Sequence, residues 1–377
     1  MVVTQESPVS PKAAIHDTEV RMITIGVDAH KRVHVAVALD AAGRQLGVWK
    51  GANSSRAWQE LKDWAAAFGG QRVWGVEGAW SYGRGLAQHL VVGGEVVCEV
   101  NSRWTALGRR SARKRGKTDR LDARSVAAFV RQEAATLPRV GEDDETAVLD
   151  LLVRERENAM AEVTRLRNQI HALLMQIDSE YEIRLRNRRL RTRMRLLESY
   201  EPPVAASTPL QRERVAAVRR LATRARVAFE HAEGLAKRIR ALAQEGFAPL
   251  TELVGVDLLT AGQLAGILGP GRRFEGESQL AAYAGAAPLE ASSAGLVRHR
   301  LNRGGHRQLN WILYRIVLTQ SQHSEQARAY LARRRQEGKT TREAFRALKR
   351  YIVRAIWRLW QLCPGAVRRE VVASAAA

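Results

Sequence analysis

Two carboxylates lie three residues apart inside one of the most basic stretches of the chain, residues 113–123. They belong to Asp119 and Asp122, and a spacing of three residues puts them on one face of a helix. Basic side chains attract phosphate, whereas paired acids bind divalent metal ions. A stretch that can do both is typical of one edge of a site that cuts nucleic acid.

Acids that could complete such a site end two predicted strands upstream, at Asp28 and Glu77. Taken singly, an acid at a strand end is more often a helix cap or a turn residue. Four acids held together repel one another unless cations neutralise them, and two Mg²⁺ ions about 4 Å apart would do so. The expected cofactor is therefore Mg²⁺ or Mn²⁺. The predicted catalytic and metal-binding acids are Asp28, Glu77, Asp119 and Asp122.

The elements of the first third follow the order β-β-β-α-β-α-β-α. Apolar and alternating runs predict the strands, and apolar residues at helical spacing predict the helices. The predicted strands are 22–28, 33–39, 44–50, 72–77 and 95–100, and the helices are 55–68, 82–92 and one that starts near Asp119. This is the order of an RNase H-like sheet, in which strand 1 is central and strand 4 lies beside it. Such a sheet would bring the four acids together.

Five titratable residues near these strands are left out of the predicted site. Asp40 ends a neighbouring strand, and Glu95 and Glu99 start or line the fifth strand. His30 and His34 flank the first strand and could touch substrate. For each histidine, however, a solvated turn position is the better prediction.

The middle of the chain, residues 145–245, is predicted to be helical. Apolar residues recur at spacings of three and four over 149–177 and 218–242, with prolines between the two runs. This pattern fits an antiparallel helical hairpin, a dimerising coiled coil or a helical subdomain packed within one chain. Residues 184–195 hold seven arginines with almost no acids to pair, which favours phosphate contact. The predicted contacts are Arg184, Arg186, Arg188, Arg189 and Arg191.

The last third predicts a second, mostly helical module for nucleic acid. Residues 250–269 have the pattern of a helix-hairpin-helix, whose turn amides meet phosphate. Farther on, Ser292 and Ser293 precede a flexible Ala-Gly pair and a basic stretch, although a Ser-Ser-Ala-Gly run alone is usually a loop. The remaining predicted phosphate contacts are Arg298, Arg300, Arg303 and Arg307, together with Arg113, Lys114, Arg115 and Lys117 before the paired acids.

The chain as a whole has 377 residues, a formal net charge of +22 and a hydrophobic fraction of 45%. The hydrophobic fraction is enough for real cores, and the charge predicts a polyanionic partner. Two distant cysteines, Cys98 and Cys363, fit a reducing cytoplasm and exclude a disulfide scaffold. No apolar run approaches the roughly 20 residues of a membrane span.

Three motifs resemble the DEDD motifs of a family of bacterial insertion-sequence transposases, whose first domain is similar to the RuvC resolvase. They are IGVDAHK at 25–31, VEG at 76–78 and KTDRLDAR at 117–124. Residues 280–309, with LAAYAG, the two serines and RGGHRQL, resemble that family's second, transposase-specific domain. The resemblance covers residues 22–135 and 250–320, and it implies a bacterial, cytoplasmic protein.

The resemblance implies an unusual serine recombinase. In that family a serine of the second domain attacks a DNA phosphodiester and becomes covalently joined to DNA, while the DEDD acids supply metal. The expected nucleophile is Ser293, with Ser292 as second choice because Ala294 stands where the family more often has glycine. A structured non-coding RNA, the bridge RNA, pairs with donor and target DNA, and the subunits act as dimers and tetramers.

The predicted organisation is therefore α/β plus α. It comprises a tail (1–20), a RuvC-like domain (21–140), a helical coiled-coil region for dimerisation and nucleic-acid binding (145–245), a transposase domain with the serine (250–365) and a second tail (366–377). Two other functions stay open from the residues. One is a RuvC-like nuclease that acts on branched DNA with water as nucleophile, and the other is a non-enzymatic nucleic-acid-binding protein.

Overall fold

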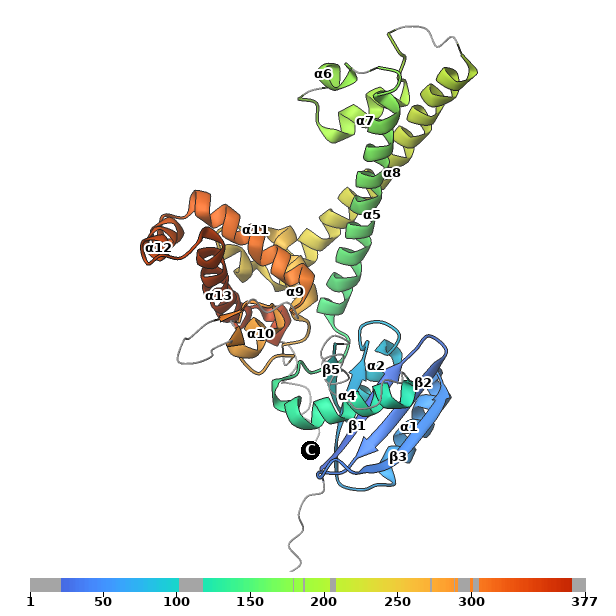
Figure 1. The fold of residues 1–377 in the computed structure, drawn as a ribbon, viewed down its shortest axis with the longest axis vertical. Helices are drawn as coiled ribbons and strands as arrows, with labels where there is room; N and C mark the ends of the chain where they lie inside the picture. Colours follow the sequence, from blue (N-terminus) through green and yellow to red (C-terminus); the bar gives the residue numbers. More distant parts are fainter. Residues whose placement is uncertain are drawn as a thin grey trace, which may run out of the picture. The chain divides into compact units, whose positions relative to one another are not determined.

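The computed structural model (Figure 1) divides the chain into two compact units, Met1–Leu137 and Pro138–Ala377. We call them the N-terminal and the C-terminal unit. The residues that the structure describes are 22–101, 118–178, 180–185, 187–203, 208–271, 273–287, 289–290, 299–300 and 305–367.

The N-terminal unit is built on a five-stranded sheet with the order β3-β2-β1-β4-β5. The strands are β1 (Met22–Ala29), β2 (Val33–Leu39), β3 (Gln45–Ala52), β4 (Gln71–Glu77) and β5 (Val96–Val100). Strands β1, β2 and β3 are antiparallel, whereas β4 and β5 run parallel to β1. The sequence-based prediction of a central strand 1 with strand 4 beside it is confirmed, and the sheet has the mixed order of an RNase H-like domain.

Helix α4 (Asp119–Glu133) packs directly against β1 and β2. Its small and branched residues join the cores on the sheet, where Ala123 and Ala127 meet the side chains of β2. Gly26 makes this contact possible, because a Cβ atom there would lie 2.1 Å from the backbone nitrogen of Ala127. The other helices among the described residues of this unit are α1 (Ser55–Ala66), α2 (Arg84–Val92) and the short 3-10 helix η1 (Ala134–Thr136).

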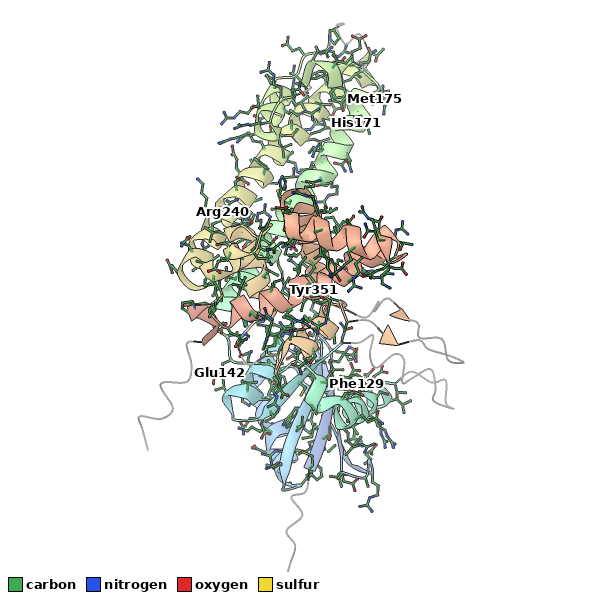
Figure 2. All side chains as sticks on the ribbon, turned by 90° about the vertical axis from the view of Figure 1, so that its left-hand side faces the viewer. Phe129, Glu142, His171, Met175, Arg240 and Tyr351 are labelled. Carbon is green, nitrogen blue, oxygen red and sulfur yellow. The ribbon has the colours of Figure 1, made fainter. Side chains whose placement is uncertain are left out.

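Two long helices, α5 (Glu145–Leu174) and α8 (Pro209–Gly246), lie side by side in the C-terminal unit (Figure 1). Helices α6 (Tyr181–Leu185) and α7 (Leu190–Glu198) cover one end of this pair. There His171 of α5, labelled in Figure 2, packs its ring against Tyr181 with 5.8 Å between the ring centroids. The two predicted apolar seams therefore pack against each other within one chain.

The rest of the C-terminal unit is helical and continues from the other end of the α5–α8 pair. Its helices are η2 (Ala248–Glu252), α9 (Leu258–Leu268), α10 (Glu277–Tyr283), α11 (Arg307–His323), α12 (Glu325–Gln336), α13 (Thr341–Trp360) and α14 (Pro364–Val367). Two short strands, β6 (Leu289–Glu290) and β7 (His299–Arg300), pair antiparallel. No helix among the described residues combines the length and the apolar character needed to cross a membrane.

The predicted helix-hairpin-helix differs from what the structure contains at residues 250–269. The first helix is only the five-residue 3-10 helix η2, and α9 is buried from Ala261 to Leu268. The glycines of α9 serve close packing, because a Cβ atom at Gly266 would lie 2.7 Å from the backbone nitrogen of Asp150 on α5. This segment is therefore a core helix with small residues.

Candidate functional site

The end of β1 and the start of α4 bring three of the predicted acids to one edge of the sheet. Asp28, near the end of β1, is buried with 6% of its surface exposed, and the register of the parallel pair places it opposite Glu77 of β4. Helix α4 begins after Thr118, whose Oγ1 accepts a hydrogen bond from the backbone nitrogen of Leu121 at 3.3 Å. Asp119 and Asp122 therefore lie in the first turn, where the helix dipole stabilises negative charge.

Asp28, His30 and Asp119 form a compact group of potential metal ligands. Each offers one ligand atom, and these three atoms lie within 4.8 Å of one another. His30 Nε2 lies 3.1 Å from Asp28 Oδ2 and 3.7 Å from Asp119 Oδ1. Carboxylate oxygens and an imidazole nitrogen are ordinary ligands of divalent metals, so the donor set fits such an ion.

The surroundings of Asp28 disfavour its charged form. Burial raises the pKa of Asp28, and the negative charges of Asp122 and Asp119 raise it further, while His30 acts in the opposite direction. Asp122 is itself buried on α4. A cation that binds between such buried, mutually repelling carboxylates stabilises their charged form. This is expected of a metal-binding site.

The structure places the four predicted acids unequally around this group. Asp28 and Asp119 belong to it, and Asp122 is close enough to Asp28 to affect its pKa. Glu77 is half-buried on the neighbouring strand and lies outside the group.

His30 is the residue that sequence reasoning missed. It occupies the expected solvated turn, with a half-exposed ring, and that ring also contacts two acids. The available signal was its spacing, because residues two apart in an extended chain point to the same side.

The expectation that His34 occupies a solvated turn is wrong. His34 is fully buried in β2, not solvated, and burial lowers its pKa. Glu95, which was left out of the predicted site, accepts hydrogen bonds from Arg72 Nη2 at 2.7 Å and from Trp74 Nε1 at 2.8 Å. Although burial acts to raise the pKa of Glu95, these bonds lower it. Glu95 therefore has a structural role between β4 and β5.

The predicted arginine run has more acidic partners than its sequence suggests. Arg184 pairs with Asp178, and Arg191 Nη2 lies 3.1 Å from Glu230 Oε1. Asp178 follows the end of α5 and Glu230 lies in α8, so the run itself does not reveal these acids. Arg188, Arg189 and Arg307 are exposed.

Several predicted site residues lie outside the described part of the chain. For Arg300 the structure describes only the backbone, as part of β7. Outside altogether are Ser292, Ser293, Arg113, Lys114, Arg115, Lys117, Arg186, Arg298 and Arg303.

Comparisons with known proteins find transposase families for segments of the chain in both units. A model of the DEDD transposases of IS110 elements matches residues 25–178, and one described as the transposase IS116/IS110/IS902 family matches residues 248–332. Together these matches span more than half of the chain.

Similar proteins from insertion elements align along almost the whole chain. An IS110 protein of 43.6 kDa from Streptomyces coelicolor is 29% identical over 379 residues, which cover 89% of this chain and 93% of the relative. An IS116 protein of 44.8 kDa from Streptomyces clavuligerus is 26% identical, with 89% and 94% covered. An IS900 protein of 42 kDa from Mycobacterium paratuberculosis is also 26% identical, with 88% and 94% covered.

A single family thus accounts for the sheet with its acids and for the helical module that follows. The chain belongs to the IS110 family of insertion-element transposases, enzymes that cut DNA and transfer its strands.

Proposed function

We propose that this transposase cuts and rejoins DNA through a covalent phosphoserine intermediate and a metal site made by its acids. The observation that carries the proposal is the meeting of Asp28 and Asp119, from segments 91 residues apart, around His30. Acids gathered at the end of β1 and the start of α4 are placed for metal binding better than for any role in folding.

Asp28, Glu77, Asp119 and Asp122 are the residues that would hold Mg²⁺ or Mn²⁺. When bound, the metal supplies positive charge for the phosphodiester undergoing attack. His30 orients the carboxylate of Asp28 through their 3.1 Å contact. Such orientation by a neighbouring group is a common requirement of carboxylate ligands.

Ser293 is the proposed nucleophile, with Ser292 as the alternative. Its Oγ attacks the phosphorus, a serine–phosphate bond forms, and one strand end leaves as a free hydroxyl. The hydroxyl of another strand then attacks the same phosphorus and releases the serine. Since a serine hydroxyl is a weak nucleophile by itself, it needs a base or a metal for activation. In sequence, Glu290 is the one acid close to Ser293, so the acidic site is the better source of activation.

The partners proposed beyond DNA are a structured guide RNA and further copies of the chain. A bridge RNA that pairs with donor and target DNA would set specificity, and dimers or tetramers would carry out the exchange. The net charge of +22 supports binding of more than one nucleic acid. Sequencing the RNA that copurifies with the protein tests the guide, and light scattering tests the assembly.

The covalent intermediate is tested with end-labelled DNA that carries the ends of the element. A protein–DNA adduct that survives denaturation is expected, and peptide mass spectrometry should map it to Ser293. The double change Ser293→Ala and Ser292→Ala should abolish the adduct. An adduct that persists in the double variant would contradict the proposal. DNA cutting without any adduct would instead support hydrolysis by water, as in a RuvC-like nuclease.

A further inference from the structure

Helix α11 presents aromatic and basic side chains that the proposed chemistry does not use. Arg307, Trp311, Tyr314 and Arg315 recur at helical spacing and are all exposed. Trp311 has 57% of its surface exposed and Tyr314 has 37%. Their rings are stacked, with 5.9 Å between centroids and 27° between planes. Tyr314 also contacts Phe345 of α13 at 6.3 Å. We call Trp311, Tyr314 and Phe345 the aromatic stripe.

Positive charge borders the aromatic stripe on both sides. Helix α11 has 17 residues and contains neither aspartate nor glutamate. Within the described part of the chain, neither Arg307 nor Arg315 forms an ion pair with an acid. Arg342 of α13 is also exposed, one turn before Phe345. Beneath this face, the buried Lys349 places its Nζ 5.4 Å from the ring centre of Tyr314. The face therefore combines flat apolar rings with cations.

This combination fits a nucleic-acid strand better than a protein. Exposed aromatic rings bind bases by stacking, and neighbouring arginines meet the phosphates. A second copy of the chain would bring the same arginines to this face, so local repulsion opposes a self-contact here. Duplex DNA hides the faces of its bases. The strand on this surface is therefore unpaired.

We propose that the aromatic stripe binds an unpaired stretch of DNA, with one base stacked on Trp311 and nearby phosphates at Arg307 and Arg315. Eight residues of helix separate the two arginines and rise about 12 Å. At about 3.4 Å for each nucleotide, three or four nucleotides span this distance. The site thus takes a short single-stranded segment.

The choice of DNA over RNA rests on the proposed function. There Ser293 joins a DNA end, and it precedes Arg307 by only 14 residues in the chain. A strand that has just been cut loses its pairing near the break, and a stacking surface would hold it for rejoining. The stripe is thus a binding surface for the strand that is exchanged.

The test measures binding of a short single-stranded DNA that carries 5-iododeoxyuridine to the full-length protein. Ultraviolet cross-linking followed by peptide mapping should identify Trp311. Trp311→Leu should weaken affinity about tenfold, and Trp311→Phe should keep most of it, since one stacked base contributes a factor of roughly 5 to 150. Arg315→Gln should lower the slope of log affinity against log salt by about 0.7.

Tyr351→Leu is the matched control for the loss of an exposed ring. Tyr351 of α13, labelled in Figure 2, is 47% exposed, yet Tyr330 packs against it at 5.1 Å and Arg354 covers its ring. Its replacement should leave the affinity for single-stranded DNA unchanged. Circular dichroism of each variant checks that the helices remain folded.

Three results would overturn the proposal. They are unchanged affinity of Trp311→Leu for single-stranded DNA, tighter binding of the same sequence as RNA, and a shift of Trp311→Leu to a smaller oligomer, which would make the stripe a subunit interface. The Ser293→Ala variant should bind and cross-link as the unaltered protein does. A failure of the serine chemistry therefore leaves this test intact, and a failure at Trp311 leaves the adduct test intact.

Discussion

At the scale of single residues, the burial of the Asp28 carboxylate bears on its proposed role as a metal ligand. A buried carboxylate is costly while charged, and burial together with Asp122 and Asp119 raises its pKa. A fold selected only for stability would avoid three acids in one place. Binding of a divalent ion would offset this cost, so the proposed metal site would lower stability in exchange for metal affinity.

Asp28→Asn removes the buried charge with almost no change in side-chain volume, and so tests its effects on metal binding and on stability separately. DNA cutting should fall by more than about 100-fold, because loss of a ligand exceeds the roughly 10- to 100-fold cost of losing a residue that only orients one. The melting temperature without metal should stay equal or rise, since the costly charge is removed. Strand-cleavage assays and thermal melts measure the two effects. A lower melting temperature would assign Asp28 a structural role.

His30→Ala tests the histidine at the same site. Affinity for Mn²⁺, measured by electron paramagnetic resonance titration, should weaken by about 10- to 100-fold. His231→Ala is the matched control, because Nε2 of His231 on α8 lies 2.9 Å from Oε1 of the exposed acid Glu155 on α5, far along the chain from the proposed metal site. Equal Mn²⁺ affinity in both variants would show that His30 does not contribute to metal binding.

At the scale of elements, the contact between β1 and α4 sets the geometry of the acids. Gly26 precedes Asp28 by two residues, and α4 carries Asp119 in its first turn. The close approach at Gly26 therefore controls the separation of the two carboxylates. Any side chain at position 26 must push α4 away from the sheet.

Gly26→Ala should accordingly destabilise the N-terminal unit by at least about 1–3 kcal/mol, the usual cost of overpacking a core. The added Cβ would meet backbone atoms of Ala123 and Ala127 at 2.3 and 2.1 Å, which cannot rotate away. Hydrogen exchange of β1 and α4 reports the change. Gly234→Ala on α8 has open space and should stabilise its helix by about 0.5–1 kcal/mol. Unchanged hydrogen-exchange rates of β1 and α4 in Gly26→Ala would show that the close contact between β1 and α4 does not require glycine.

The junction of α11 and α13 contains a buried lysine. Lys349 Nζ donates hydrogen bonds to Asn310 O at 3.1 Å and to Asn310 Oδ1 at 2.7 Å. Burial lowers the pKa of Lys349 to about 8, against 10.5 in an unfolded chain. Between these values the unfolded state binds more protons, so the free energy of unfolding rises with pH.

Lys349→Met provides the reference for this effect. The free energy of unfolding of the unaltered protein minus that of the variant should be constant below about pH 8 and increase up to about pH 10.5. Urea denaturation at pH 7 and pH 10 measures the difference. An equal difference at both values would show that Lys349 keeps its ordinary pKa.

The sequence predicts elements well where the signal is local. Alternating runs mark β1 and β2, and strand order then places Asp28 beside Glu77. The rest depends on contacts between distant segments. The contact of His30 with Asp119 requires α4 to fold back on β1, and the burial of the Gly266 region depends on α5, so neither could be read from a local pattern.

At the scale of the whole molecule, positive charge dominates. The chain has 61 lysines and arginines against 39 acids, and this excess must be neutralised by phosphate to avoid self-repulsion. DNA affinity should therefore fall steeply with salt, by about a thousandfold or more between 50 and 200 mM, as for six to ten phosphate contacts. Fluorescence anisotropy over this range measures the slope. A flat profile would exclude phosphate contact as the main source of affinity.

The α5–α8 pair is a rod of fixed length within the C-terminal unit. Thirty residues of α5 rise about 45 Å, which equals the length of about 13 base pairs of DNA. The arginines of α6 and α7 lie at one end of this rod and α9 at the other (Figure 1). The helix pair thus separates the arginines of α6 and α7 from the buried helix α9 by more than one turn of a DNA double helix.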